Sequence, residues 1–124
     1  MILGIGTDVI EIDRIKKAIQ NPAFLERVFS PNERTYCNGR GKQAFASYAA
    51  RFAGKEAVMK ALGTGLSGGK LVEIEIMPDA KGKPVVSLTG AFDKIANEIG
   101  VQKIYLSLSH CREYATAQAV VWGK

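Results

Sequence analysis

Two carboxylates and two lysines carry the chemistry that this sequence suggests. Asp8 lies at the end of an apolar opening segment, and Glu56 lies between Lys55 and Lys60 in a helical segment. Two carboxylates are too few for Ca²⁺, but they suit Mg²⁺, which keeps several waters and completes its octahedron with substrate phosphate oxygens. Zinc is not expected, because no histidine or thiolate accompanies them. The residues therefore indicate a magnesium ion held against a phosphate-bearing ligand, an arrangement suited to phosphoryl transfer.

Helical spacing places Lys60, more than Lys55, on the same face as Glu56. At about 100° per residue, Phe52 and Lys60 lie about 40° to either side of Glu56, and Lys55 about 100° away. The plain alternative is a surface ion pair between Glu56 and Lys60, worth about 0.3–0.5 kcal/mol. Against it, Glu56 borders a stripe of small side chains that would pack closely on a neighbouring element. The stripe consists of Ala46, Ala50, Ala53, Ala57 and Ala61.

The order of expected helices and strands predicts an α+β domain, with a mostly antiparallel sheet packed against a long central helix that positions these residues. The opening strand is expected to be buried, with Gly4 and Gly6 allowing close approach of another backbone. Strands are expected over residues 2–10, 71–77, 84–89, 103–109 and 114–122. Helices are expected over residues 12–19, 22–29, 31 to a break at 38–41, about 42–62 and 92–99.

Four sequence signals predict where helices begin and end. Asn21 before Pro22 is typical of an N-cap, and the run 30–33 is typical of a capping box. Gly63 and Gly100 are expected as C-terminal caps. The glycine-rich run 63–65 also lets backbone groups approach a ligand closely.

The composition limits the classes of protein to which this chain can belong. The 124 residues, 47% of them hydrophobic and 23% charged, predict a single domain over residues 1–124. Neither a membrane span nor a signal peptide is expected. Cys37 and Cys111 share no metal or redox spacing, so we expect two free thiols in a reducing cytoplasm. The net charge of +5 favours a nucleotide, nucleic acid or acidic protein as partner, and scattered basic residues without a recognition motif disfavour nucleic acid.

Two further features each allow two interpretations. His110, the only histidine, is either a polar residue at a strand end or a ligand-binding residue in a loop. Arg14, Lys16 and Lys17 lie on the outward face of the helix over residues 12–19, and that face is either simply solvated or a docking surface. As a docking surface, together with the nearby Phe24 and Arg27, this face would bind an acidic protein.

Four motifs in order give the chain a wider resemblance. They are Gly4-Ile-Gly-Thr-Asp8 with Asp13-Arg14-Ile15, Arg51-Phe-Ala-Gly-Lys-Glu-Ala57 with Lys60-Ala-Leu-Gly-Thr-Gly65, Ile74-Glu-Ile76 with Gly82-Lys-Pro84, and Ser107-Leu-Ser-His110 before Tyr114-Ala115. Together they resemble the holo-acyl-carrier-protein synthases, small bacterial 4′-phosphopantetheinyl transferases, over nearly the whole chain. There are two departures: Gly54 replaces a frequent alanine, and residues 71–73 lack an aromatic residue that the family often has.

The resemblance implies an activity. Members of the family transfer the 4′-phosphopantetheine arm of coenzyme A to a serine of apo-acyl carrier protein, which releases adenosine 3′,5′-bisphosphate and serves fatty acid biosynthesis. Asp8 and Glu56 match the magnesium ligands, and Glu56 and Lys60 the catalytic pair, with Lys60 at the pyrophosphate. The positions that match coenzyme A contacts are Arg51, Lys60, Gly63, Gly65 and His110. Those that match the carrier-protein contacts are Arg14, Lys17, Phe24 and Arg27. The family is typically a homotrimer with its sites between subunits.

Other classes of function remain open from the residues themselves. A non-catalytic module that binds a phosphate ligand or an acidic protein would share the basic surface but would not need magnesium. A nucleic-acid binder would show a steep salt dependence. For the transferase, the general base is unassigned among a water on the metal, Glu56 and a carboxylate of the partner.

Overall fold

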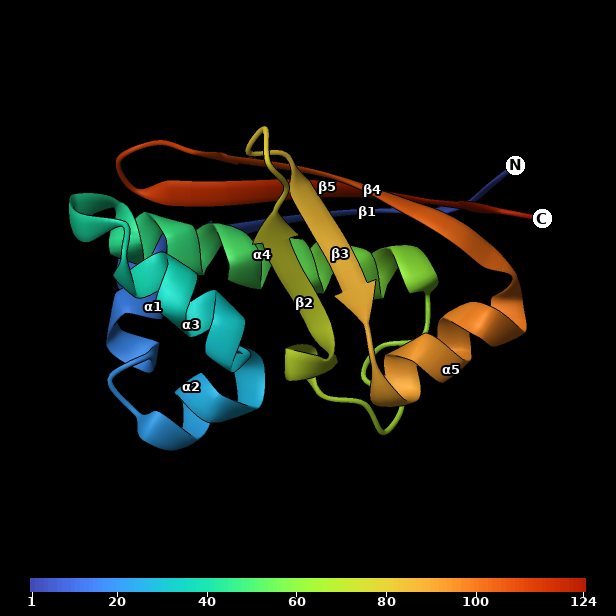
Figure 1. Ribbon diagram of the computed structural model, residues 1–124, viewed down its shortest axis with the longest axis horizontal. Helices are drawn as coiled ribbons and strands as arrows, with labels where there is room; N and C mark the ends of the chain where they lie inside the picture. The colour runs from blue at the N-terminus through green and yellow to red at the C-terminus, as the bar shows by residue number, and fades with distance from the viewer.

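The chain folds around one long helix, α4 (Ala44–Leu62), in the computed structural model, which describes residues 1–124. One face of α4 packs on an antiparallel sheet with strand order β1-β5-β4. The hairpin β2–β3 forms a second sheet and crosses in front of α4 in Figure 1. The strands are β1 (Ile2–Glu11), β2 (Ile74–Pro78), β3 (Pro84–Leu88), β4 (Val101–His110) and β5 (Tyr114–Gly123). The predicted α+β fold with an antiparallel sheet on a long helix is confirmed, with the strands divided between two sheets.

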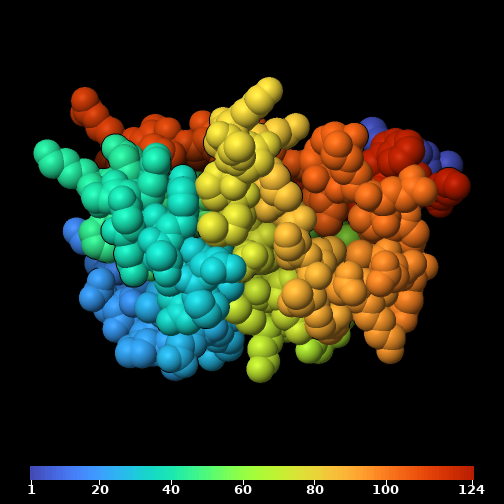
Figure 2. All heavy atoms as spheres, viewed as in Figure 1, coloured from blue at the N-terminus to red at the C-terminus, as the bar shows by residue number.

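Four shorter helices complete the fold. They are α1 (Ile12–Ala18), α2 (Pro22–Val28), α3 (Pro31–Asn38) and α5 (Gly90–Ile99). Helices α1 to α3 gather beside one end of α4, and α5 connects β3 to β4 (Figure 1). Figure 2 shows that α3, the hairpin and α5 make up the surface over α4 in this view. The long helix is therefore enclosed between the sheet and these elements.

The predicted caps are present. The Asn21 side chain accepts a hydrogen bond from the backbone of Ala23, and Ser30 and Glu33 form the capping box. Gly63 ends α4 with φ of 78°, and Gly100 ends α5 with φ of 83°, both in the left-handed region that favours glycine.

Several element boundaries differ from the expected ones. A 3₁₀ turn, η1 (Gly41–Gln43), precedes α4, so that helix begins at Ala44. A second 3₁₀ turn, η2 (Leu71–Glu73), is closed by the Glu73 carboxylate on the Lys70 backbone N–H at 3.1 Å, and β2 begins only after it. β1 extends one residue beyond the expected range, to Glu11, so Asp8 lies inside the strand and not at its end.

The prediction that β1 is buried was also wrong for one of its faces. Ile2, Ile5 and Val9 are 62, 71 and 61% exposed, on the side of the sheet turned away from α4. A run of apolar residues is typical of a strand covered on both sides. Within one chain, α4 covers only one side of β1, which leaves these three apolar residues exposed.

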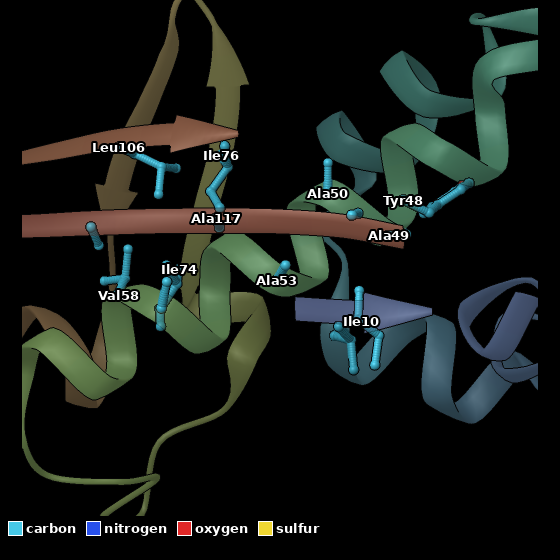
Figure 3. Packing of buried hydrophobic residues seen from close by; sticks show 14 of the residues in the cluster. Ile10, Tyr48, Ala49, Ala50, Ala53, Val58, Ile74, Ile76, Leu106 and Ala117 are labelled. Atoms are coloured by element: carbon cyan, nitrogen blue, oxygen red, sulfur yellow. The ribbon is translucent and has the colours of Figure 1, made fainter. Parts of the chain in front are cut away.

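Backbone contact between β1 and α4 sets the position of the candidate site. A Cβ added to Gly6 would overlap the carbonyl oxygen of Ala57 and lie 2.8 Å from the Ala61 nitrogen. The alanine stripe is buried, as predicted, with Ala53 and Ala57 fully enclosed. Figure 3 shows Ala50 and Ala53 of this helix beside the strand that carries Ala117. Because Gly6 of β1 and Ala57 of α4 have no bulky side chains, this strand and the helix approach closely enough for their polar residues to lie near each other.

The core contains an ion pair that the sequence did not reveal. Lys55 Nζ lies 2.8 Å from Glu33 Oε1, and both side chains are fully buried. Lys55 also donates to the carbonyl oxygens of Leu71 and Ile74, and Glu33 accepts from the Ile76 N–H. Burial lowers the pKa of Lys55, while the charge of Glu33 opposes that shift. Lys55 thus ties α3, α4 and β2 together and lies apart from the Asp8–Glu56 site.

Candidate active site

Asp8 and Glu56 line the same cavity, of about 370 Å³. Asp8 belongs to the face of β1 that packs on α4, and Glu56 faces the strand from the helix. The other residues that line the cavity are mostly apolar: Val9, Ile10, Arg14, Ile15, Ala18, Phe24 and Phe52. Two carboxylates 48 positions apart in the printed sequence therefore meet at one partly enclosed surface.

Lys60 completes the charged group. Its Nζ lies 3.2 Å from Asp8 Oδ1 and donates to the Thr7 carbonyl oxygen at 3.0 Å. The Lys60 side chain is 53% exposed, whereas that of Asp8 is 17% exposed. The prediction that Lys60, more than Lys55, shares the face of Glu56 is confirmed.

The electrostatics of the site favour a cation. Burial raises the pKa of Glu56, the negative charge of Asp8 raises it further, and the Lys60 ammonium opposes both. The two carboxylates thus repel each other in a cavity that is partly shielded from water. No third carboxylate, histidine or cysteine joins them in a metal-binding group. This donor set fits Mg²⁺, a hard ion that takes few protein oxygens and fills its remaining positions with water and phosphate.

Residues expected to receive a carrier protein lie at or near this cavity. Arg14 and Phe24 line it, and Arg27 is exposed on α2. Lys17 is also exposed, with its Nζ 3.0 Å from Asp13 Oδ2.

Sequence reasoning missed Phe52 as a residue of the site. Its ring lies 6.2 Å from that of Phe24, so the two aromatic residues form part of the same cavity wall. A signal was available, since Phe52 lies one helical turn before Glu56 and therefore on the same face.

The residues expected to contact coenzyme A are not brought together within one chain. Gly63 and Gly65 follow the C-terminal end of α4, with positive φ and open space where a side chain would be. His110 lines a different cavity, of about 870 Å³, together with Lys42 and Ala46 near the start of α4. A helix of 19 residues is about 28 Å long, which separates these two groups.

The Arg51 side chain lies in the core and has its contacts there. Its Nε donates to the Ile76 carbonyl oxygen at 3.2 Å, and its guanidinium lies 4.5 Å from the centre of the Tyr36 ring. Its side chain is buried, unlike that of Lys60. In this arrangement Arg51 supports the packing of the hairpin on α4.

Residues 4–119 match the sequence model of the 4′-phosphopantetheinyl transferase superfamily. This chain belongs to that superfamily. A relative from Ruminiclostridium cellulolyticum, named holo-[acyl-carrier-protein] synthase, is 51% identical over 124 residues, which cover 98% of this chain and 92% of the relative. A relative of the same name from Geotalea daltonii is 45% identical and matches over 98% of both chains. The resemblance seen in the sequence motifs is confirmed.

Solved structures agree with this assignment. The acyl carrier protein synthase of Plasmodium yoelii, with ADP bound, superposes with a TM-score of 0.88 at 36% identity, covering 100% of this chain and 97% of that one. The holo-(acyl-carrier-protein) synthase of Bacillus anthracis, in complex with CoA (3′,5′-ADP), gives 0.82 at 36% identity, covering 100% and 99%. None of the helices is long and apolar enough to cross a membrane.

Proposed function

We propose that this protein is a holo-acyl-carrier-protein synthase. It transfers the 4′-phosphopantetheine arm of coenzyme A to a serine hydroxyl of apo-acyl carrier protein and releases adenosine 3′,5′-bisphosphate. The observation that carries the proposal is the cavity where Asp8 and Glu56 meet beside Lys60, in a chain similar end to end to proteins of that name. We place the reaction in fatty acid biosynthesis. We also place it in the cytoplasm, which the two unpaired cysteines support.

In this reaction the serine oxygen forms a bond to the phosphorus that carries pantetheine, and the diphosphate P–O bond breaks. Asp8 and Glu56 would hold Mg²⁺, which supplies charge stabilisation and orientation to the diphosphate when bound. Lys60 places an ammonium beside this pair, where it stabilises charge on the departing phosphate. The serine comes from the carrier, so the chain needs no nucleophile of its own. The base that accepts the serine proton stays unassigned.

Intact mass spectrometry tests the reaction class. Purified apo-carrier is incubated with coenzyme A, Mg²⁺ and this protein, and a parallel sample contains EDTA. We expect the carrier to gain the mass of one phosphopantetheine only in the sample with free Mg²⁺. A non-catalytic binding module, the competing class, would leave the carrier mass unchanged in both.

Charge reversal at Arg14 tests the docking surface. Arg14 is exposed at the rim of the Asp8–Glu56 cavity, where it can attract an acidic helix of the carrier. We expect Arg14→Glu to raise the apparent KM for the carrier about tenfold or more, with coenzyme A affinity unchanged. Steady-state kinetics with each substrate varied in turn measures both. Lys94→Glu, the same reversal on α5, is the control, and equal changes for both substrates would show that the surface is misplaced.

We further propose a homotrimer whose sites lie between subunits. Two observations support assembly. The distance along α4 separates His110 from Gly63, so one chain does not gather both around a single ligand. The outer face of the sheet carries exposed apolar residues, and Ile5 pairs there with Val120, which pairs in turn with Tyr105. An uncovered apolar face of this kind is typical of an interaction surface.

Ile5→Lys tests the assembly. A lysine in the middle of this outer face would be buried without a partner on association, so we expect monomers in sedimentation velocity experiments. Val85→Lys, a similar change at an exposed residue of the other sheet, should leave the assembly intact. A monomeric wild-type protein, or an unaltered Ile5→Lys assembly, would contradict the proposal for this face.

A further inference from the structure

The Lys60 ammonium contacts one of the two carboxylate oxygens of Asp8, the residue proposed as a metal ligand. The ammonium lies 3.2 Å from Asp8 Oδ1 and 3.0 Å from the Thr7 carbonyl oxygen. Both acceptors belong to β1, so the side chain reaches from α4 across to the strand. Lys60 thus partly neutralises the negative charge of the carboxylate pair.

The charges of the site show that this contact and a metal ion compete. Asp8 and Glu56 together carry two negative charges, and Lys60 carries one positive charge. A divalent cation added beside Lys60 would give three positive charges against two negative ones, at short separation in a partly dehydrated cavity. A diphosphate restores the balance of charge, because its negatively charged oxygens can bind the metal and accept hydrogen bonds from the ammonium.

We infer that Lys60 holds Asp8 until coenzyme A offers its diphosphate, so that metal and coenzyme A bind cooperatively through this lysine. The inference rests on the proposed function, because it takes coenzyme A as the diphosphate ligand. It adds a second role for Lys60, as a cation that competes with the metal for Asp8. By linkage, coenzyme A strengthens metal binding by the same factor as the metal strengthens coenzyme A binding.

Removing the lysine should therefore tighten metal binding in the absence of coenzyme A. In wild type, the metal must displace the ammonium from Asp8. In Lys60→Met that displacement is not needed, and a nearby positive charge is gone. Partly exposed ion pairs are weak, so we expect an affinity gain of about two- to fivefold. Because the ammonium must be displaced from Asp8 only when coenzyme A is absent, the enhancement of metal binding by coenzyme A should be smaller in Lys60→Met than in wild type.

Mn²⁺ titrations followed by electron paramagnetic resonance of the free ion measure both affinities directly. Wild type, Lys60→Met and Lys60→Arg are titrated with and without saturating coenzyme A. Lys94→Met, on the exposed face of α5, removes the same charge elsewhere and should behave as wild type. Lys60→Arg keeps a cation that can reach Asp8, so it should also bind Mn²⁺ weakly on its own. Because the Lys60 side chain is half exposed, thermal melts should confirm that the variants remain folded.

The outcomes separate this inference from the proposed function. Mn²⁺ binding to Lys60→Met alone that is equal to or weaker than that of wild type would overturn the inference, as would an equal gain in Lys94→Met. If wild type with coenzyme A bound no Mn²⁺, the metal site itself would be wrong and the inference would fall with it. A tighter site in Lys60→Met only, with Lys60→Arg resembling wild type, would establish the competition.

Discussion

Replacing Glu56 with glutamine should leave a folded protein that has lost magnesium-dependent transfer to the carrier. The substitution keeps the size and helix preference of the residue but removes one of two carboxylates that face the cavity. With a single carboxylate left, we expect the rate of labelling to fall about a hundredfold or more, comparable with the loss of other preorganised charge-stabilising groups. The measurement is the initial rate of carrier modification at saturating Mg²⁺. Near-wild-type labelling would remove Glu56 from the metal site.

The same variant should be at least as stable as wild type at neutral pH without metal. Burial and the charge of Asp8 raise the pKa of Glu56 in the folded protein. A group with a raised pKa contributes stability at pH values below its unfolded pKa, and this contribution is lost as pH rises through the folded pKa. Ionised Glu56 therefore carries a cost at neutral pH that glutamine avoids.

Thermal melts across the acid to neutral range test this sign. The melting temperature of Glu56→Gln relative to wild type should rise with pH. Glu98→Gln, an exposed change on α5, should show no such trend. A Glu56→Gln protein that is less stable than wild type at neutral pH would indicate that Glu56 has a structural role.

Gly6→Ala should disrupt both the fold and the site. The added methyl group would overlap the Ala57 carbonyl oxygen and crowd the Ala61 nitrogen, both of which are backbone atoms that cannot rotate away. Strand and helix would have to separate, which we expect to cost about 3 kcal/mol of stability. Activity should fall as well, because Asp8 is carried by the same strand two residues later. Urea denaturation and the labelling assay measure the two effects.

Gly39→Ala is the matched control for this substitution. Gly39 has φ of −77°, and an added Cβ would lie no closer than 3.4 Å to its neighbours. We expect wild-type stability and activity there. If Gly6→Ala behaved in the same way, close backbone contact between β1 and α4 would not be what positions Asp8.

The meeting of Asp8 and Glu56 could be predicted because its cause is local and repeated in the sequence. Glycines in an apolar strand and alanines at helical spacing both indicate close backbone approach, and Gly6 and Ala57 do meet. The caps were predictable for a similar reason, since Asn21 and Gly63 act on neighbouring backbone groups.

The buried pair of Lys55 and Glu33 could not be predicted in this way. Its partners are 22 residues apart on different helices, and the helical spacing of Lys55 indicates only that it points away from Glu56. The exposed outer side of β1 could not be predicted, because the sequence of an apolar strand does not indicate whether its own chain or another chain packs on its second face. Likewise, the separation of His110 from Gly63 depends on how β4 lies along α4, which no local pattern specifies.

We propose that Asp8 and Glu56 jointly hold a metal ion against the diphosphate of coenzyme A. Anomalous diffraction from crystals grown with Mn²⁺ and coenzyme A locates the ion directly. We predict one Mn²⁺ peak that touches a carboxylate oxygen of Asp8, a carboxylate oxygen of Glu56 and a diphosphate oxygen. A Mn²⁺ peak bound to the diphosphate but to neither carboxylate would contradict this proposal.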